Sequence, residues 1–296
     1  MAERDPGSEP RGAAAIPIGL RYMAASAFFF SVMSLLVKAA GQRLPTQEIV
    51  LARSSVGALL SWMVLRSRGV SVLGNRKGLL VVRALLGYGA LSCFFYALVH
   101  LPLADATVIQ YTNPVFTALL AAALLSEKLR AREIVLVLVS LAGVVLMARP
   151  GFLFGGLEER LALGAAAIAL LGALLSAGAY VTVRKLGATE DPLVIIFYFA
   201  AVSSLGAIPL TAADAVLPTA AEWAALAGIG VITQLGQVCL TKGLRLEPAG
   251  RAMAVGYMQI VFAALWGLLF FAELPDAWGA AGALLIIAGT FGIARR

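Results

Sequence analysis

Ten apolar stretches follow one another along the chain, and short polar, proline-containing or glycine-containing connections separate them. A helix needs about 20 mostly apolar residues to cross the hydrocarbon core of a bilayer. Inside that core every backbone polar group must be paired within the segment, which favours helices. We therefore predict an all-α membrane protein whose ten transmembrane helices lie at residues 17–39, 46–66, 78–99, 104–125, 132–149, 161–184, 192–212, 223–243, 249–272 and 276–294.

Composition excludes most other classes of protein. Hydrophobic residues make up 61% of the chain and charged residues 13%, against about 45–50% and about 25% in soluble domains. The net charge of +7 is interrupted by apolar runs, so we expect the lipid bilayer as a partner and no nucleic acid. Cys93 and Cys239 lie inside apolar runs and His100 is the single histidine, so we expect no metal site and no cofactor.

Basic residues are distributed unevenly between the two sides of the membrane. If the N-terminus is cytoplasmic, the inner side carries 18 of the 23 lysines and arginines, and the outer side carries five. Basic loops stay in the cytoplasm, so the pattern predicts a protein of the bacterial inner membrane with both termini cytoplasmic. Residues 1–16 are polar and contain two prolines, and we expect them to form a disordered cytoplasmic tail.

The chain also matches itself at an offset of 146 residues. Between residues 98–149 and 244–295, 15 of 52 positions are identical without a gap. The matched residues include Pro102 and Pro248, Tyr111 and Tyr257, Glu127 and Glu273, and Gly143 and Gly289. Each half holds five spans, an odd number, so the second half starts on the opposite side of the membrane. Such inverted repeats are typical of transporters that work by alternating access.

The two halves resemble the drug/metabolite transporter superfamily, in its EamA-type branch with two EamA repeats. The features that carry the resemblance are Phe28–Lys38, Pro45 with Arg53, Ala104-Asp105-Ala106 through Tyr111-Thr112-Asn113-Pro114 to Glu127, Tyr180–Arg184, Gln234–Lys242, and Tyr257 through Glu273. Residues 17–149 would form the first repeat and residues 161–294 the second. The tryptophan usual in the first span of the family is replaced by Phe28-Phe29-Phe30. The resemblance implies ten helices around a central cavity that moves small metabolites, often amino acids and usually outward.

Polar and aromatic side chains inside the spans are the candidates for substrate binding, because they are costly in lipid and tend to face a cavity. They are Ser31, Ser34, Lys38, Arg53, Tyr88, Ser92, Tyr96, Gln110, Tyr111, Asn113, Tyr180, Arg184, Thr233, Gln234, Gln237, Tyr257, Gln259 and Trp266.

The cations among these candidates have alternative roles. Arg53 is suited to bind a carboxylate with its guanidinium fork, but it is also placed to pair with Glu48 or to reach the outer interface. Lys38 and Arg184 are repeat equivalents that would lie beside the two openings of the cavity. For Arg184 the alternative is anchoring on the basic inner side.

The polar candidates also leave alternatives open. Asn113-Pro114 predicts a kink in the fourth span, whether for a cavity or for packing. Tyr88, Ser92 and Tyr96 share one helix face, which fits either a cavity lining or hydrogen bonds between helices. We interpret the glycines of the last span as packing residues; these are Gly279, Gly282, Gly289 and Gly292.

The absence of Asp and Glu from the middle of every span argues against a proton/cation antiporter. We therefore predict an alternating-access exporter of small metabolites, most of all amino acids or related zwitterions, acting as a monomer or homodimer. A broad-range efflux carrier for aromatic or cationic compounds is the alternative. An enzyme is not expected, because the spans hold no nucleophile–base pair or metal cluster. A membrane scaffold or receptor would be favoured if no solvated cavity existed.

Overall fold

The computed structural model describes residues 16–101, 103–128, 130–154, 163–212, 215–271 and 276–294. Lys38 lies in a described helix, but its side chain is outside the described part, as are the first 15 residues of the expected tail and Glu273. All regular elements within these ranges are helices. They are α1 (Ile18–Ala40), α2 (Thr46–Ser67), α3 (Lys77–His100), α4 (Leu103–Gln110), α5 (Asn113–Leu125), α6 (Ala131–Ala148), α7 (Gly151–Phe154), α8 (Leu163–Leu186), α9 (Pro192–Thr211), α10 (Ala220–Leu246), α11 (Ala249–Val255), α12 (Met258–Phe271) and α13 (Ala277–Ala294).

Ten spans are long and apolar enough to cross a bilayer, as the sequence predicts. Eight of them are single helices. The fourth span consists of α4 and α5, and the ninth consists of α11 and α12. The eighth span begins a few residues before the predicted residue 223, because Thr219 and Glu222 form a capping box that starts α10 at Ala220.

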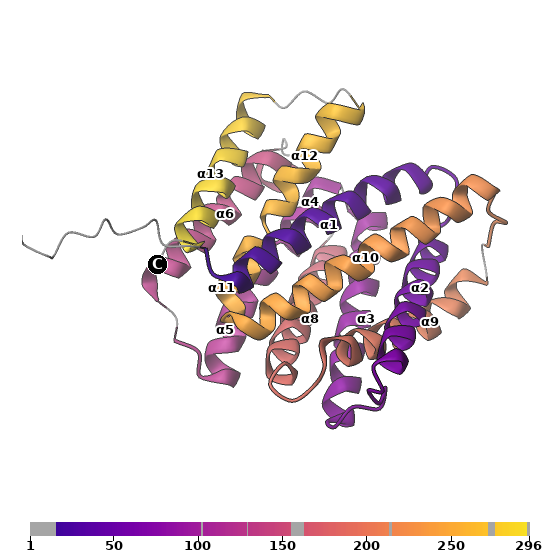
Figure 1. Cartoon of the computed structure of the whole chain (residues 1–296). Helices are drawn as coiled ribbons and strands as arrows, with labels where there is room; N and C mark the ends of the chain where they lie inside the picture. The colour runs from indigo at the N-terminus through magenta and orange to yellow at the C-terminus, as the bar shows by residue number, and fades with distance from the viewer. Residues whose placement is uncertain are drawn as a thin grey trace, which may run out of the picture.

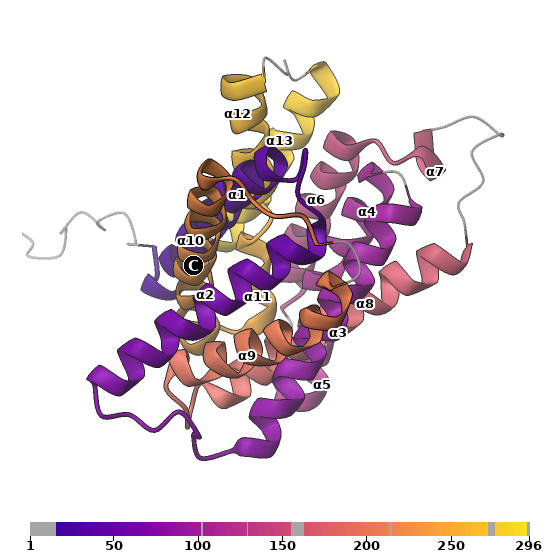
Figure 2. The ribbon, with the colours of Figure 1, turned by 90° about the vertical axis from the view of Figure 1, so that its right-hand side faces the viewer.

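The helices pack in pairs that obey the repeat. α1 packs along α10, and the repeat equivalents of these two helices, α8 and α3, pack along each other. α2 packs on its own equivalent α9, and α6 packs on its equivalent α13. Figure 1 shows α1 and α10 side by side with α6 and α13 at one edge, and Figure 2 views the bundle from the α2 side. Exchanging the two halves thus maps this set of helix pairs onto itself, as expected for a pseudo-two-fold relation.

The start of α1 and the end of α13 lie on one face of the bundle, which we call the terminal face. At the start of α1, Gly19 packs against Glu247, and Glu247 pairs with Arg251 at 3.6 Å. Arg251 donates to the carbonyl of Ile293 at the end of α13. α8, the equivalent of α1, ends at this same face, where Arg184 contacts the end of α10. The second repeat is therefore inverted relative to the first, as predicted.

The glycines of α13 allow a close approach to α6. A Cβ on Gly282 would lie 2.6 Å from Met147 Cγ and 3.0 Å from the Met147 backbone nitrogen. A Cβ on Gly289 would lie 2.8 Å from the Leu136 carbonyl oxygen. Interfaces of small residues let transmembrane helices approach and pack by van der Waals contact. The α6–α13 pair thus forms a scaffold at the edge of the bundle.

Candidate functional site

Two spans are broken near their middle, at equivalent positions of the two repeats. α4 ends at Gln110 and α5 begins at Asn113, with Pro114 in its first turn. α11 ends at Val255 and α12 begins at Met258. The sequence predicts the first break from Pro114. It does not predict the second, because Ile260 stands where the first repeat has proline.

Side chains near the breaks satisfy the carbonyls that the helices leave free. Asn113 Nδ2 donates to the Gln110 carbonyl at 2.8 Å, and the Tyr257 hydroxyl donates to the Tyr111 carbonyl at 3.0 Å. The rings of Tyr111 and Tyr257 stack with centroids 6.0 Å apart. Because these tyrosines are repeat equivalents, their contact marks the pseudo-two-fold axis. Broken helices at such an axis are a recurrent way to build a transporter site.

A cavity of about 200 Å³ lies beside this axis. It is lined from α1, α3, α4, α5, α8, α10, α11 and α12, which together are six spans drawn from both repeats. Its volume is below the range of about 300–1,000 Å³ found for pockets that take drug-sized ligands, so it suits a small solute. Its polar lining consists of Ser26, Gln110, Tyr111, Asn113, Tyr180 and Gln259.

Two of the lining residues have unused hydrogen-bond acceptors. Gln110 donates from Nε2 to Ser176 Oγ at 3.2 Å, but its Oε1 is buried and has no partner within the described ranges. Asn113 Oδ1 is likewise buried and has no hydrogen-bond partner among the described residues. Unpaired buried oxygens are costly, so a ligand with N–H donors would be stabilised beside them.

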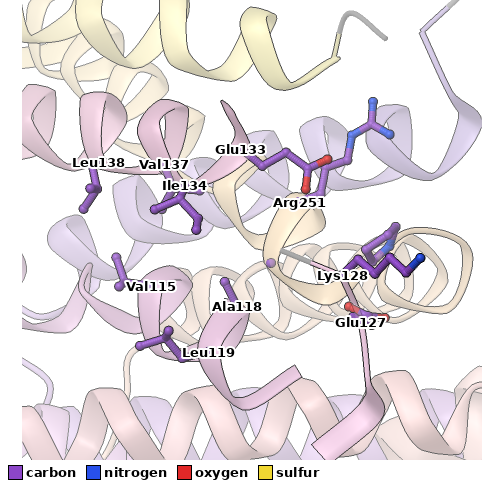
Figure 3. A pocket seen from close by; sticks show the side chains of 12 residues that line it. Val115, Ala118, Leu119, Glu127, Lys128, Glu133, Ile134, Val137, Leu138 and Arg251 are labelled. Carbon is purple, nitrogen blue, oxygen red and sulfur yellow. The ribbon is translucent and has the colours of Figure 1, made fainter. Parts of the chain in front are cut away.

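Ion pairs and hydrogen bonds close the bundle at the terminal face. Arg184 Nε binds Glu127 Oε1 at 2.9 Å, and its Nη1 donates to the carbonyl of Arg245 at 2.6 Å. Glu127 Oε2 accepts from the backbone N–H of Ala249 at 2.8 Å. Figure 3 shows Glu127 beside a small cavity of about 70 Å³ between α5, α6 and α11. These contacts link the end of α8 to the start of α11, so Arg184 is part of the closure.

Equivalent residues differ in burial between the two faces. In α8, seven of the eleven residues 176–186 at the terminal face are buried. In α1, the equivalent residues 30–40 approach the opposite face, and only Ser31 and Ala40 of those whose side chains are described are buried. In α11 every residue except Arg251 is buried. The bundle is therefore tightly packed at the terminal face and loosely packed at the opposite face.

The profile of the EamA-like transporter family matches residues 17–149 and 163–295, which together cover most of the chain. The chain belongs to the EamA-like transporter family. The pseudopaline exporter CntI of Pseudomonas aeruginosa is 40% identical over 271 residues, covering 91% of this chain and 93% of CntI. Human solute carrier family 35 member G1 is 32% identical, over 94% of this chain and 79% of that protein. A crystal structure of a protein 20% identical superposes with a TM-score of 0.83 over 94% of this chain and 96% of its own, which supports the fold.

This EamA-like transporter places several of the predicted residues outside the cavity. Tyr88 packs against Gly206 of α9, and Ser92 Oγ donates to the Tyr88 carbonyl within α3. Tyr96 is 41% exposed and stacks on His100. The spacing of four residues does put the three on one helix face, but in this conformation that face meets α9 and the surface.

Of the three polar candidates of α10, one is hydrogen-bonded to α2 and two have a buried oxygen without a partner among the described residues. Gln234 Nε2 donates to Ser61 Oγ of α2 at 2.7 Å, and Gln234 also borders an open groove of about 680 Å³ between α2, α9 and α10. Thr233 Oγ1 and Gln237 Oε1 are buried without a partner within the described ranges. None of these three lines the central cavity.

The candidates of α1 and α12 lie toward the opposite face. Trp266 Nε1 donates to Ser31 Oγ at 2.9 Å, and Phe28 packs edge-on against Trp266. Ser34 Oγ donates to the Phe30 carbonyl of its own helix. These contacts join α1 to α12 beside the loosely packed end of the cavity.

Two arginines lie inside spans without a carboxylate partner among the described residues. Arg53 contacts Met33 Sδ at 3.6 Å, and its Nε is buried and unpaired. The alternative pairing with Glu48 is not formed, since Glu48 accepts from the backbone of Val216 instead. The second is Arg83 of α3, which the charge pattern of the sequence places only among the basic residues of the inner side. Its place six residues inside a span was the available signal.

Proposed function

We propose that this EamA-like transporter exports a small zwitterionic metabolite, such as an amino acid or a related compound, across the bacterial inner membrane by alternating access. The observation that carries the proposal is the central cavity, which takes its lining from both repeats and lies next to both mid-membrane helix breaks. A site at the axis of two inverted repeats is accessible from either side of the membrane when one repeat moves against the other.

The chemistry of the lining favours a ligand with both an ammonium and a carboxylate group. The free oxygens of Gln110 and Asn113 are suited to accept hydrogen bonds from an ammonium. Arg53 of α2 does not line the cavity in this conformation, but its unpaired guanidinium is suited to bind a carboxylate in the opposite half of the membrane. Cationic compounds, the alternative class, would need an acidic partner, and no Asp or Glu is found among the described residues that line the cavity.

The direction of transport and the orientation are inferred together. The relative CntI is named an exporter, which supports outward transport by this chain. Most lysines and arginines lie toward the terminal face, which supports a cytoplasmic location for that face. With that face inside, the conformation described here is closed to the cytoplasm and corresponds to the stage at which an exporter releases its substrate outward.

Two experiments test this function. The chain, expressed in Pseudomonas aeruginosa cells that lack CntI, should restore pseudopaline to the culture medium if the two transporters share a substrate class. Purified protein in liposomes should take up labelled amino acids and not labelled lipophilic cations. Uptake of the cations alone would replace the proposal with the broad-range efflux carrier.

The orientation is tested by reporter fusions at Arg296. We expect a fluorescent protein fused there to fold and fluoresce, and a periplasmic alkaline phosphatase fused there to stay inactive. An active phosphatase would reverse the assignment of the terminal face, and with it the assignment of this conformation as outward-facing.

A further inference from the structure

Arg83 is a buried guanidinium inside the membrane for which the cavity described above provides no role. It lies six residues from the start of α3 and is 3% exposed. Its Nε and Nη1 have no hydrogen-bond partner in the part of the chain that the structure describes. Charged side chains inside a membrane protein usually pair with one another or mark the path of a ligand.

The surroundings of Arg83 form a cradle for the guanidinium. Its Cζ lies 4.5 Å from the centre of the Phe199 ring of α9, a cation–π arrangement. A Cβ on Gly87, one turn along α3, would collide with the Arg83 guanidinium and lie 2.9 Å from the Phe199 ring. Tyr180 of α8, which lines the central cavity, lies within electrostatic range of Arg83. The guanidinium is thus held between α3 and α9, and α3 also packs along α8, which carries Tyr180.

The repeat gives Arg83 a counterpart that a sequence alignment of the halves does not reveal. At the offset of 146, Arg83 is equivalent to Ile229, and its ring partner Phe199 is equivalent to Arg53. The α3–α9 contact corresponds in the same way to the contact between α10 and α2. Each half of the membrane therefore holds one arginine at the equivalent helix junction, and opposite members of the helix pair carry it. Arg83 is buried, and Arg53 is partly buried with a buried Nε.

A guanidinium in this place needs a negative partner that the described residues do not provide. The ring of Phe199 offsets only part of the cost of removing the charge from water. No acidic residue lies in the middle of a span, and no described carboxylate pairs with Arg83, so a ligand is a suitable source of the negative charge. A carboxylate matches the guanidinium in shape and charge through two parallel hydrogen bonds.

We propose that Arg83 is an anion-recognition residue that binds the carboxylate of the transported compound when the bundle opens at the terminal face, and that Arg53 is its counterpart for the opposite face. The inference rests on the proposed function and assigns the substrate an obligatory anionic group. In the closed arrangement Arg83 is shielded from that face. Opening the contacts around Arg184 and Ala249 would have to expose the part of α3 that carries Arg83, between α8 and α9, to a ligand.

Sided kinetics in oriented membrane vesicles test the assignment. Arg83→Gln should raise the KM for a labelled amino acid presented at the terminal face by about tenfold or more, the loss expected for one hydrogen bond between charged groups. The KM at the opposite face should stay within about twofold, and Arg53→Gln should show the reverse pattern. Arg83→Lys keeps the positive charge but loses the two parallel donors of the guanidinium, so its KM at the terminal face should lie between those of the wild type and Arg83→Gln. Equal changes at both faces would overturn the proposal in favour of a purely structural arginine.

A binding measurement separates this inference from the proposed function. Benzoate should raise the melting temperature of purified protein more than its neutral analogue benzamide. The difference should shrink in Arg83→Gln and vanish in the Arg53→Gln/Arg83→Gln double variant, while Lys77→Gln, an exposed cation at the start of the same helix, behaves as wild type. A retained benzoate effect in the double variant would overturn the anion site. Failure of the wild type to transport amino acids, with the benzoate pattern intact, would count only against the proposed substrates.

Discussion

The ion pair between Glu127 and Arg184 should control how often the terminal face opens. Glu127 joins the α5–α6 connection to Arg184 at the end of α8 and to the N–H of Ala249 at the start of α11. All these contacts span helices that must separate if the cavity is to open at this face. Glu127→Gln removes the charge, keeps the shape of the side chain and leaves one amide oxygen for the backbone contact.

The expected size of the effect follows from the burial of the pair. Hydrogen bonds between charged groups contribute about 1.5–3 kcal/mol, and partly exposed pairs lie at the low end because water screens them. The two side chains are 26% and 16% exposed, so we expect a loss of about 1.5 kcal/mol in the closed state only. Since about 1.4 kcal/mol corresponds to a factor of ten, the population open at the terminal face should rise about tenfold.

Cysteine labelling measures that population. Met253 lies buried in the cavity on the terminal side, so Met253→Cys should react with a membrane-impermeant maleimide only when this face opens. The labelling rate from the terminal face should rise about tenfold in Glu127→Gln and stay unchanged in Glu133→Gln, a neighbouring glutamate in Figure 3. Ile286→Cys, buried between α6 and α13, serves as the probe for general loosening. An unchanged Met253→Cys rate, or equal increases at both probes, would refute the role of the Glu127–Arg184 pair in closing this face.

Three further predictions follow from the packing of the axis and the scaffold. Asn113→Ala should lower kcat/KM for uptake into liposomes by about tenfold, the effect expected for the loss of one hydrogen bond to the ligand. The melting temperature should change by no more than a few degrees, and unchanged uptake would remove Asn113 from the site. Gly289→Leu should overpack α13 against the Leu136 carbonyl and destabilise the protein by about 1–3 kcal/mol. The protein in detergent should then aggregate at a lower temperature, and an aggregation temperature equal to that of the wild type would contradict the close contact. Pro114→Ala should keep the transport rate within about threefold of the wild-type rate, a smaller change than the loss of one hydrogen bond would cause. The reason is that the equivalent break in the ninth span forms with Ile260 in place of proline. Loss of transport would indicate that Pro114 causes the break in the fourth span.

The spans were predictable because the bilayer fixes their length and polarity. The third span, for example, was expected at residues 78–99 and extends from Lys77 to His100. The inverted relation of the halves was also predictable, from Pro, Tyr, Glu and Gly pairs at one offset and from odd span counts. These features depend on the solvent and on chain order, both of which are visible in a sequence.

The contents of the site were less predictable, because side-chain periodicity gives a shared face but not the neighbour of that face. Tyr88 and Tyr96 share a face of α3, yet Gly206 of α9 leaves room that Tyr88 fills. Gln110 and Asn113 reach the cavity because the helix break turns them toward it. Arg83 was counted as an ordinary cytoplasmic cation, because the charge bias of the loops already accounted for it. A cation that lies well inside the span and has glycine four residues later deserves a separate explanation.

The tyrosine pair on the pseudo-two-fold axis should act as a conformational reporter, since only one of two equivalent hydroxyls is used in this state. Tyr257 is fully buried and donates to the Tyr111 carbonyl, which the helix break has freed. No hydrogen bond from the Tyr111 hydroxyl is found among the described residues. If the two repeats exchange conformations during transport, the Tyr111 hydroxyl should donate to the Tyr257 carbonyl in the state that opens at the terminal face.

Removing each hydroxyl should therefore shift the equilibrium in opposite directions. Tyr257→Phe leaves a buried carbonyl unpaired in the present state, at a cost of about 1–3 kcal/mol, and should accelerate the labelling of Met253→Cys from the terminal face by about fivefold or more. Tyr111→Phe imposes the same penalty on the exchanged state and should slow the labelling. If both variants changed the rate in the same direction, the tyrosines would act only through packing. The exchange of equivalent hydrogen bonds at the axis would then be excluded, even if the Glu127–Arg184 pair behaved as expected.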